Sequence, residues 1–141
     1  PLSDTDIFKA QFYKHYSSLG KKDEFIRRWK DLEAVCDDIF AAPSGSPMDE
    51  LFTRYMYFER AKQGIKNTTT EALRKFYEKD SYAILKNNDT LDNLECLAEF
   101  WRKVSVQDEK FSDKGIEKIV CLELCTEWYV DISGIGVFYA V

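Results

Sequence analysis

One amphipathic stripe constrains this chain more than any other feature. Between Asp23 and Phe40 the apolar side chains recur at three- and four-residue spacing, which is the period of an α helix with one buried face. The members of the stripe are Phe25, Ile26, Trp29, Leu32, Cys36, Ile39 and Phe40. A stripe this long needs other elements to cover it, so the helix must belong to a packed domain.

The rest of the chain shows the same period. Ser3, Ser46, Thr68 and Thr90 stand where N-caps are expected, because serine and threonine oxygens accept hydrogen bonds from the first amides of a helix. The expected helices cover residues 4–19, 23–40, 47–64, about 70–77, 90–104 and about 112–128. A short segment around residues 82–85 lies between the fourth and fifth helices, and the tail at 131–141 has no clear period.

Composition supports a helical fold. The 141 residues contain only six glycines and three prolines, too few for the frequent turns of a β-sandwich or barrel. We therefore expect an all-α, bundle-like domain of about six helices over residues 1–141, with its weakest seam at 41–47. The chain starts at Pro1 without a methionine and stops in an apolar run, so we expect a fragment of a longer protein.

Residues with catalytic or metal-binding chemistry are scarce. With His15 as the one histidine and no Cys-x-x-Cys pair, the usual zinc motifs cannot be built, and no glycine-rich phosphate loop is present. We therefore expect no cofactor, no metal site and no enzymatic activity of this chain alone. The alternative at Cys121 and Cys125, whose spacing places two thiols on one helix face, is a soft-metal or redox pair.

The cysteines and the hydropathy pattern bear on the compartment. Four cysteines at irregular positions do not suggest a disulfide framework, so we expect reduced and mostly buried thiols. No apolar stretch approaches the 18 or more residues of a membrane span, and no signal segment opens the chain. These observations predict a cytoplasmic bacterial protein without a membrane partner.

A basic segment stands out from an acidic chain. The formal net charge is −5, yet residues 54–79 hold seven basic side chains against three acidic ones. Cations interleaved with tyrosines can contact phosphates and stack on bases, which predicts a nucleic-acid surface. The candidate residues are Arg54, Arg60, Lys62, Lys66, Arg74 and Lys75. The simpler interpretation is that Tyr55 and Phe58 belong to the core while the cations only solvate a helix.

Several stretches resemble one family. Residues 1–10 (Pro-Leu-Ser-Asp-Thr-Asp-Ile-Phe-Lys-Ala), the Phe25-Ile26 pair and residues 29–33 (Trp-Lys-Asp-Leu-Glu) are similar to a segment of the GmrSD type of modification-dependent restriction and phage-defence proteins. Residues 51–56, 60–62, 68–77 and 94–101 extend the resemblance over about residues 1–104.

The resemblance implies a role beside the chemistry of such a protein. Members of the family begin with a ParB-like domain that hydrolyses nucleotides through an Asp-Gly-Gln-Gln-Arg motif, continue with a helical region, and often end in an HNH nuclease. Neither that motif nor a His-Asn-His constellation exists in this sequence. The resemblance thus implies a non-catalytic helical domain that couples an upstream ParB-like domain to a nuclease, with DNA contact as a further role. The alternative is an independent helical protein-interaction or dimerisation module unrelated to restriction.

Overall fold

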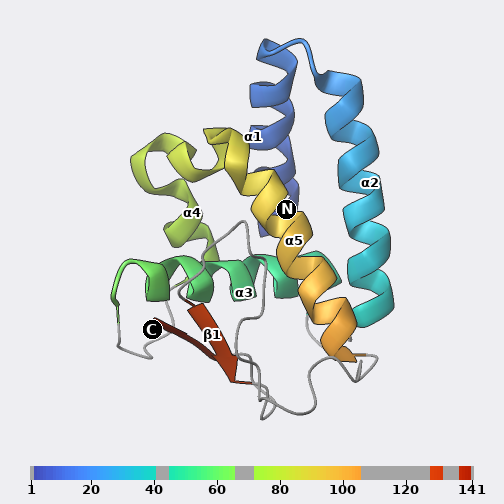
Figure 1. Ribbon diagram of the computed structural model, residues 1–141. Coiled ribbons are helices and arrows are strands. Elements are labelled where there is room, and N and C mark those ends of the chain that lie inside the picture. Colours follow the sequence, from blue (N-terminus) through green and yellow to red (C-terminus); the bar gives the residue numbers. More distant parts are fainter. Residues whose placement is uncertain (1, 41–44, 66–71, 106–127, 132–136, 141) are drawn as a thin grey trace.

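The computed structural model describes residues 2–40, 45–65, 72–105, 128–131 and 137–140. These residues form five α helices, one short 3-10 helix and two short strands (Figure 1). The expected all-α, bundle-like class is confirmed, with five described helices in place of about six. Most of the sixth expected helix falls on 106–127, outside the described residues, but Trp128, its expected last residue, begins a strand.

The first two helices form an antiparallel pair, α1 (Asp4–Ser18) and α2 (Lys22–Ile39) (Figure 1). The cap expected at Ser3 is present, since its hydroxyl accepts from the Asp6 amide and the Asp6 carboxylate accepts from the Ser3 amide, both at 3.1 Å. Gly20 ends the first helix in the left-handed region at φ +70°, which a residue without a Cβ adopts at little cost.

The stripe of α2 is buried as predicted, apart from Ile26 and the half-buried Ile39. Phe25, Trp29, Leu32 and Cys36 lie in the core. Ile26 is 47% exposed, so its assignment to the stripe was wrong. Each residue turns an α helix by about 100°, which carries the side chain after Phe25 to the edge of the buried face.

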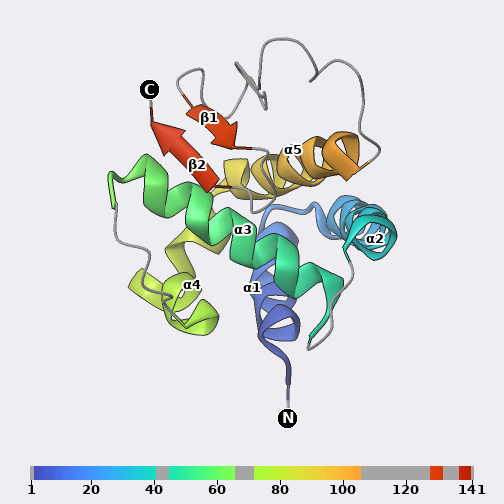
Figure 2. The same ribbon diagram turned by 90° about the horizontal axis from the view of Figure 1, so that it is seen from below.

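The third helix, α3 (Pro47–Lys62), runs across the lower ends of the first two (Figures 1 and 2). It begins with the expected proline and a capping box between Ser46 and Asp49. Asp49 also accepts a hydrogen bond from the Thr5 hydroxyl of α1. One carboxylate therefore completes a helix cap and fastens α1 to α3.

Two helices and a short connector complete the bundle. They are α4 (Leu73–Tyr82), the 3-10 helix η1 (Ala83–Lys86) and α5 (Asn88–Ser105). The cap expected at Thr68 lies outside the described residues. The cap expected at Thr90 was wrong, because α5 starts two residues earlier and Asn87 Oδ1 accepts from the Asp89 amide at 2.9 Å. The Thr90 hydroxyl instead donates to the carbonyl of Ile84 at 2.5 Å.

The five helices share one aromatic core. Phe52 of α3 lies at its centre, with ring centroids 5.0 Å from Phe8, 6.0 Å from Trp29 and 5.2 Å from Tyr77. Residues of α5 from Leu91 to Trp101 join the same cluster. Elements on both sides of the expected seam at 41–47 thus pack on each other.

A β-hairpin lies against α3 (Figure 2). Strand β1 (Trp128–Asp131) pairs antiparallel with β2 (Val137–Ala140), and Trp128 stands opposite Ala140. Part of the tail that had no helical period is therefore extended.

Candidate nucleic-acid interface

The five described cations of the set predicted to bind nucleic acid do not form a single surface. Arg54, Arg60 and Lys62 lie on α3, and Arg74 and Lys75 lie on α4. Lys66 lies outside the described residues. The described side chains differ in what surrounds them.

Arg54 is held between aromatic rings. Its Cζ atom lies 4.9 Å from the ring centroid of Phe40 and 4.2 Å from that of Trp101. Its side chain is only 26% exposed, and its Nε lies 3.6 Å from the Glu50 carboxylate, beyond hydrogen-bond distance. Burial lowers the pKa of this guanidinium, with Glu50 acting in the opposite direction. The stacking of cation on ring ties α3 to the ends of α2 and α5.

Arg60 is buried. The residue is 6% exposed, and its Cζ lies 6.0 Å from the ring centroid of Tyr57. A phosphate in solution cannot approach a guanidinium in this position without moving the residues that cover it. Arg54 therefore acts in the packing of α3, and Arg60 is withdrawn from solvent.

Lys62, Arg74 and Lys75 are exposed, at the end of α3 and the start of α4. Arg74 pairs with Asp4 of α1, with Nε 2.8 Å and Nη2 2.7 Å from the same carboxylate oxygen. Pairs this exposed contribute little to stability and exchange readily with other anions. These three side chains are the described members of the predicted set that a phosphate can reach.

The predicted stacking rings belong partly to the core. Tyr55 is buried, where its hydroxyl donates to Glu59 at 2.8 Å and accepts from Asn93 Nδ2 at 3.2 Å. Burial, followed by the charge of Glu59, raises the pKa of Tyr55. Phe58 is also buried, while Tyr57 is half-buried. For Tyr55 and Phe58 the simpler interpretation, a place in the core, is therefore correct.

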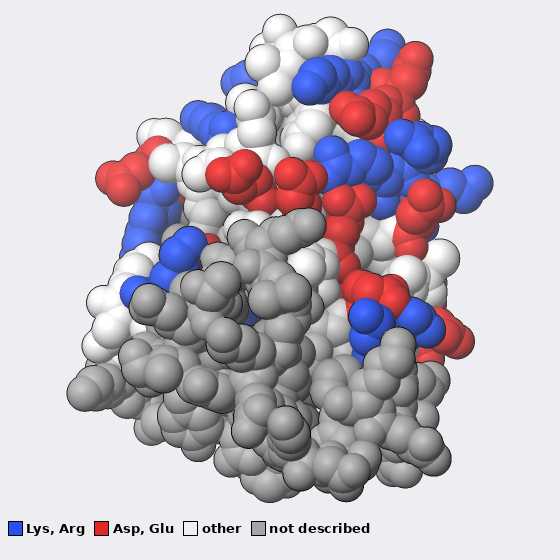
Figure 3. All heavy atoms as spheres, viewed as in Figure 1, with Lys and Arg blue, Asp and Glu red and all other residues white. Residues whose placement is uncertain are grey.

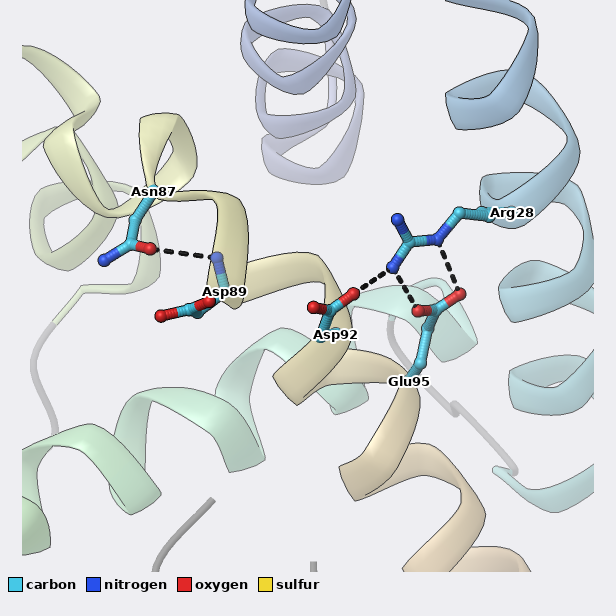
Figure 4. Close-up of polar contacts among 5 residues, drawn as sticks. All are labelled: Arg28, Asn87, Asp89, Asp92 and Glu95. Atoms are coloured by element: carbon cyan, nitrogen blue, oxygen red, sulfur yellow. Dashed lines mark hydrogen bonds and ion pairs between the residues drawn. The ribbon is translucent and has the colours of Figure 1, made fainter. Parts of the chain in front are cut away.

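The ion-pair fork between α2 and α5 was not anticipated from the sequence (Figure 4). Arg28 Nε donates to Glu95 at 3.1 Å, and its Nη2 donates to both Glu95 and Asp92. The hydrogen bond with Glu95 raises the pKa of Arg28, which is 17% exposed. Two acidic residues three positions apart on α5 were the available signal, but nothing in the sequence pairs them with Arg28.

Charge on the visible face is mixed. Figure 3 shows lysines and arginines alternating with acidic side chains over the upper right of the molecule, where α2 and the ion pairs lie. Nucleic-acid surfaces are usually continuous in positive potential. The described part of this face does not have that property.

Other candidate chemistry is limited in the described ranges. No three histidine, cysteine or acidic side chains there come together as a metal site. His15 Nε2 lies 2.8 Å from Asn88 Oδ1, which joins α1 to the start of α5.

The cysteines fall into two groups. Burial raises the pKa of the free Cys36 thiol to about 12, so it is unreactive at neutral pH. Cys96 is disulfide-bonded, which corrects the expectation that all four cysteines are reduced. Cys121 and Cys125, the alternative metal or redox pair, lie outside the described residues.

Each helix in the described ranges is too short or too polar to span a membrane.

Comparisons with known proteins found no relative of this chain. No family model, curated protein or solved structure matches the chain.

Proposed function

We propose that this chain is the non-catalytic helical domain of a prokaryotic phage-defence restriction protein of the GmrSD type. It couples an upstream ParB-like, nucleotide-hydrolysing domain to a nuclease domain of the same system. The proposal starts from the sequence resemblance over residues 1–104, and the position of the resembling residues supports its non-catalytic part.

The residues that carry the resemblance are architectural. Ser3 and Asp6 form the cap of α1, and Thr5 joins α1 to Asp49. Trp29 and Leu32 lie in the core. Side chains used for caps and packing leave no reactive group to act on a substrate, so they support a scaffold in this part of the protein. This is the observation on which the proposal depends most.

The proposed DNA contact involves the exposed cations. Of the described members of the predicted set, Lys62, Arg74 and Lys75 are accessible, while Arg54 is stacked between rings and Arg60 is buried. A surface of this size supplies a few phosphate contacts and no base reading, so binding would be weak and strongly dependent on salt.

The full reading frame and one charge-reversal series test the proposal. We expect an Asp-Gly-Gln-Gln-Arg domain immediately upstream of Pro1, and we expect Lys62→Glu/Arg74→Glu/Lys75→Glu to lower phage restriction by the full-length protein. The matched control, Lys14→Glu/Lys21→Glu/Lys22→Glu, reverses three exposed lysines near the turn between α1 and α2. A reading frame without the upstream domain contradicts the family assignment. Equal restriction by both triple variants contradicts the proposed DNA contact and leaves the family assignment unaffected.

The absence of catalysis is tested on the chain itself. We propose that the purified 141-residue chain neither hydrolyses GTP or ATP nor cuts DNA. Turnover that co-purifies with the chain through two orthogonal columns would overturn this part of the proposal.

A restriction protein acts in the cytoplasm, whereas a disulfide at Cys96 is typical of an oxidising compartment. Disulfides are rare in cytosolic proteins because thiol reductants keep cysteines reduced. Alkylation of thiols in freshly lysed native cells decides between the two. Modification of all four cysteines agrees with the cytoplasm, and protection of Cys96 until a reductant is added agrees with an oxidising compartment.

One observation favours the alternative of an independent interaction module. Tyr13, Leu19 and Ile26, on and between α1 and α2, are each at least 40% exposed. Exposed apolar residues are common singly, but a group on one helical hairpin can serve a protein partner. Two results together would support this alternative. The reading frame would lack the upstream domain, and the chain would form a dimer that Ile26→Lys abolishes.

A further inference from the structure

Residues 79–82, at the end of α4, are not helical and form a strained turn. Asp80, Ser81 and Tyr82 have φ values of 53°, 56° and 62°, in the left-handed region. Lys79, just before them, is extended at φ −53° and ψ 137°. Residues with a Cβ visit the left-handed region singly, at a bias against it of about five- to thirty-fold each. Three such residues in succession make the backbone of this turn energetically unfavourable.

Packing on both sides of the turn holds it in this shape. Before the turn, Tyr77 is buried and its hydroxyl donates to the Phe52 carbonyl at 2.5 Å. After the turn, Leu85 is buried and the Ile84 carbonyl accepts from the Thr90 hydroxyl at 2.5 Å. Because both flanks are fixed, the backbone between them must take an unfavourable path.

Helix α4 buries fewer side chains than its neighbours α1 and α3. It buries only Phe76 and Tyr77, where α3 buries seven side chains. Its N-cap, Ala72, offers no side-chain hydrogen bond, and its ion pair to α1 through Arg74 is exposed. Elements with few buried contacts open locally before the whole domain unfolds. In Figures 1 and 2, α4 lies at the edge of the bundle.

We propose that α4 is a strained latch. It leaves its seat on α1 and α3 as a unit, with residues 79–82 as the hinge, and the return of these residues to right-handed or extended backbone favours the open state. Opening withdraws Tyr77 from Phe8 and Phe52, whose ring centroids lie 4.6 Å and 5.2 Å from its own. The domain thereby has a docked and an undocked state of α4, and a conformational switch requires two such states. This inference concerns the chain by itself and does not depend on the proposed function.

Amide hydrogen exchange of the 141-residue chain tests the latch. We expect the Phe76 and Tyr77 amides to exchange faster than the Leu94 and Leu97 amides of α5. Ser81→Gly removes the Cβ from the left-handed turn and should slow exchange in α4 about fivefold or more. Ser81→Ala is the matched control, because it removes the exposed hydroxyl and keeps the Cβ, and it should leave exchange within about twofold.

Ser81→Thr should change the rate of amide exchange in α4 in the opposite direction to Ser81→Gly. A branched Cβ is less tolerant of positive φ, so this variant should speed α4 exchange relative to Ser81→Ala. The latch is refuted if α4 and α5 amides exchange at the same rate in the unmodified chain. It is equally refuted if the glycine and alanine variants exchange alike, or if the threonine variant is no faster than the alanine variant.

Discussion

Helices α2 and α4 show two ways of holding a helix in the same core. Along α2 the apolar period, the buried stripe and the fork from Arg28 to α5 all favour one position. On α4 the burial of two rings is accompanied by a left-handed turn, which α2 does not have, whereas neither helix has a side-chain N-cap. Where local preference and packing agree, a helix belongs to the framework, and where they conflict it can move. The following experiments test that difference, beginning with the largest expected effect.

Truncation of a side chain in the α2 stripe should lower the free energy of unfolding most. Trp29 is buried, with ring centroids 5.7 Å from Phe25 and 6.0 Å from both Phe12 and Phe52. We expect Trp29→Ala to lower the free energy of unfolding by about 3–5 kcal/mol, because the cavity removes contacts to three rings. Urea denaturation followed by circular dichroism measures this loss.

Phe76→Ala in α4 is the counterpart. If α4 can leave while the rest stays folded, contacts made only by α4 cannot contribute more than its docking free energy. We therefore expect a smaller loss than for Trp29→Ala in the same urea experiment. Equal losses would mean that α4 is part of the framework.

Alkaline pH should weaken the two helices at different points. Burial raises the pKa of Cys36, on α2, from 9.0 to about 12, and raises the pKa of Tyr77, on α4, above 10.0. The folded state holds both protons more tightly, so this stability is complete at neutral pH and is lost as pH rises. The loss begins near pH 9 for Cys36 and near pH 10 for Tyr77, at up to about 1.4 kcal/mol per pH unit for each group.

Two substitutions separate these contributions. Cys36→Ala should flatten the dependence of unfolding free energy on pH between 9 and 10, and Tyr77→Phe should flatten it only above 10. Urea midpoints at half-unit pH intervals give both slopes. A slope unchanged by either substitution would show that other groups govern alkaline unfolding.

Two of the ion pairs between helices, Arg28 with Glu95 and Arg74 with Asp4, should differ in coupling energy. The Arg28 side chain is 17% exposed and donates to Glu95 through two nitrogens. The side chains of Arg74 and Asp4 are 48% and 32% exposed. Double-mutant cycles with Arg28→Met/Glu95→Gln and Arg74→Met/Asp4→Asn should give about 1–2 kcal/mol for the first pair and below about 1 kcal/mol for the second. A larger coupling energy for Arg74 and Asp4 would contradict the view of α4 as the looser helix.

The features predicted correctly from the sequence are local. The caps at Ser3 and Ser46 depend on a partner three residues away, and the stripe of α2 depends on a period that is visible within one helix. Both can be read without knowing the fold. The helical class followed from these patterns and from the scarcity of glycine and proline.

The features that escaped prediction depend on distant residues. Arg54 was expected on a surface, but Phe40 and Trp101, from two other elements, enclose it. The turn at Asp80 contains no glycine, so its left-handed backbone comes from the anchoring of Tyr77 and Leu85. Of the candidate site, the sequence pattern identified the cations and could not tell which of them the fold would bury.

A serine at position 72 would give α4 the side-chain cap that it lacks, and we expect only a small change in stability. Ala72 has the extended backbone of an N-cap, at φ −60° and ψ 130°, but no side-chain oxygen, so Ala72→Ser can accept from the amides of the first turn. We expect a gain of about 0.5–1 kcal/mol in unfolding free energy and slower amide exchange in α4. Lys21→Ser is the control, because the N-cap of α2 has ψ 29° and cannot present its side chain in the same way. If Lys21→Ser stabilises the chain as much as Ala72→Ser, the gain does not come from the extended N-cap backbone at Ala72, and the predicted cap is contradicted.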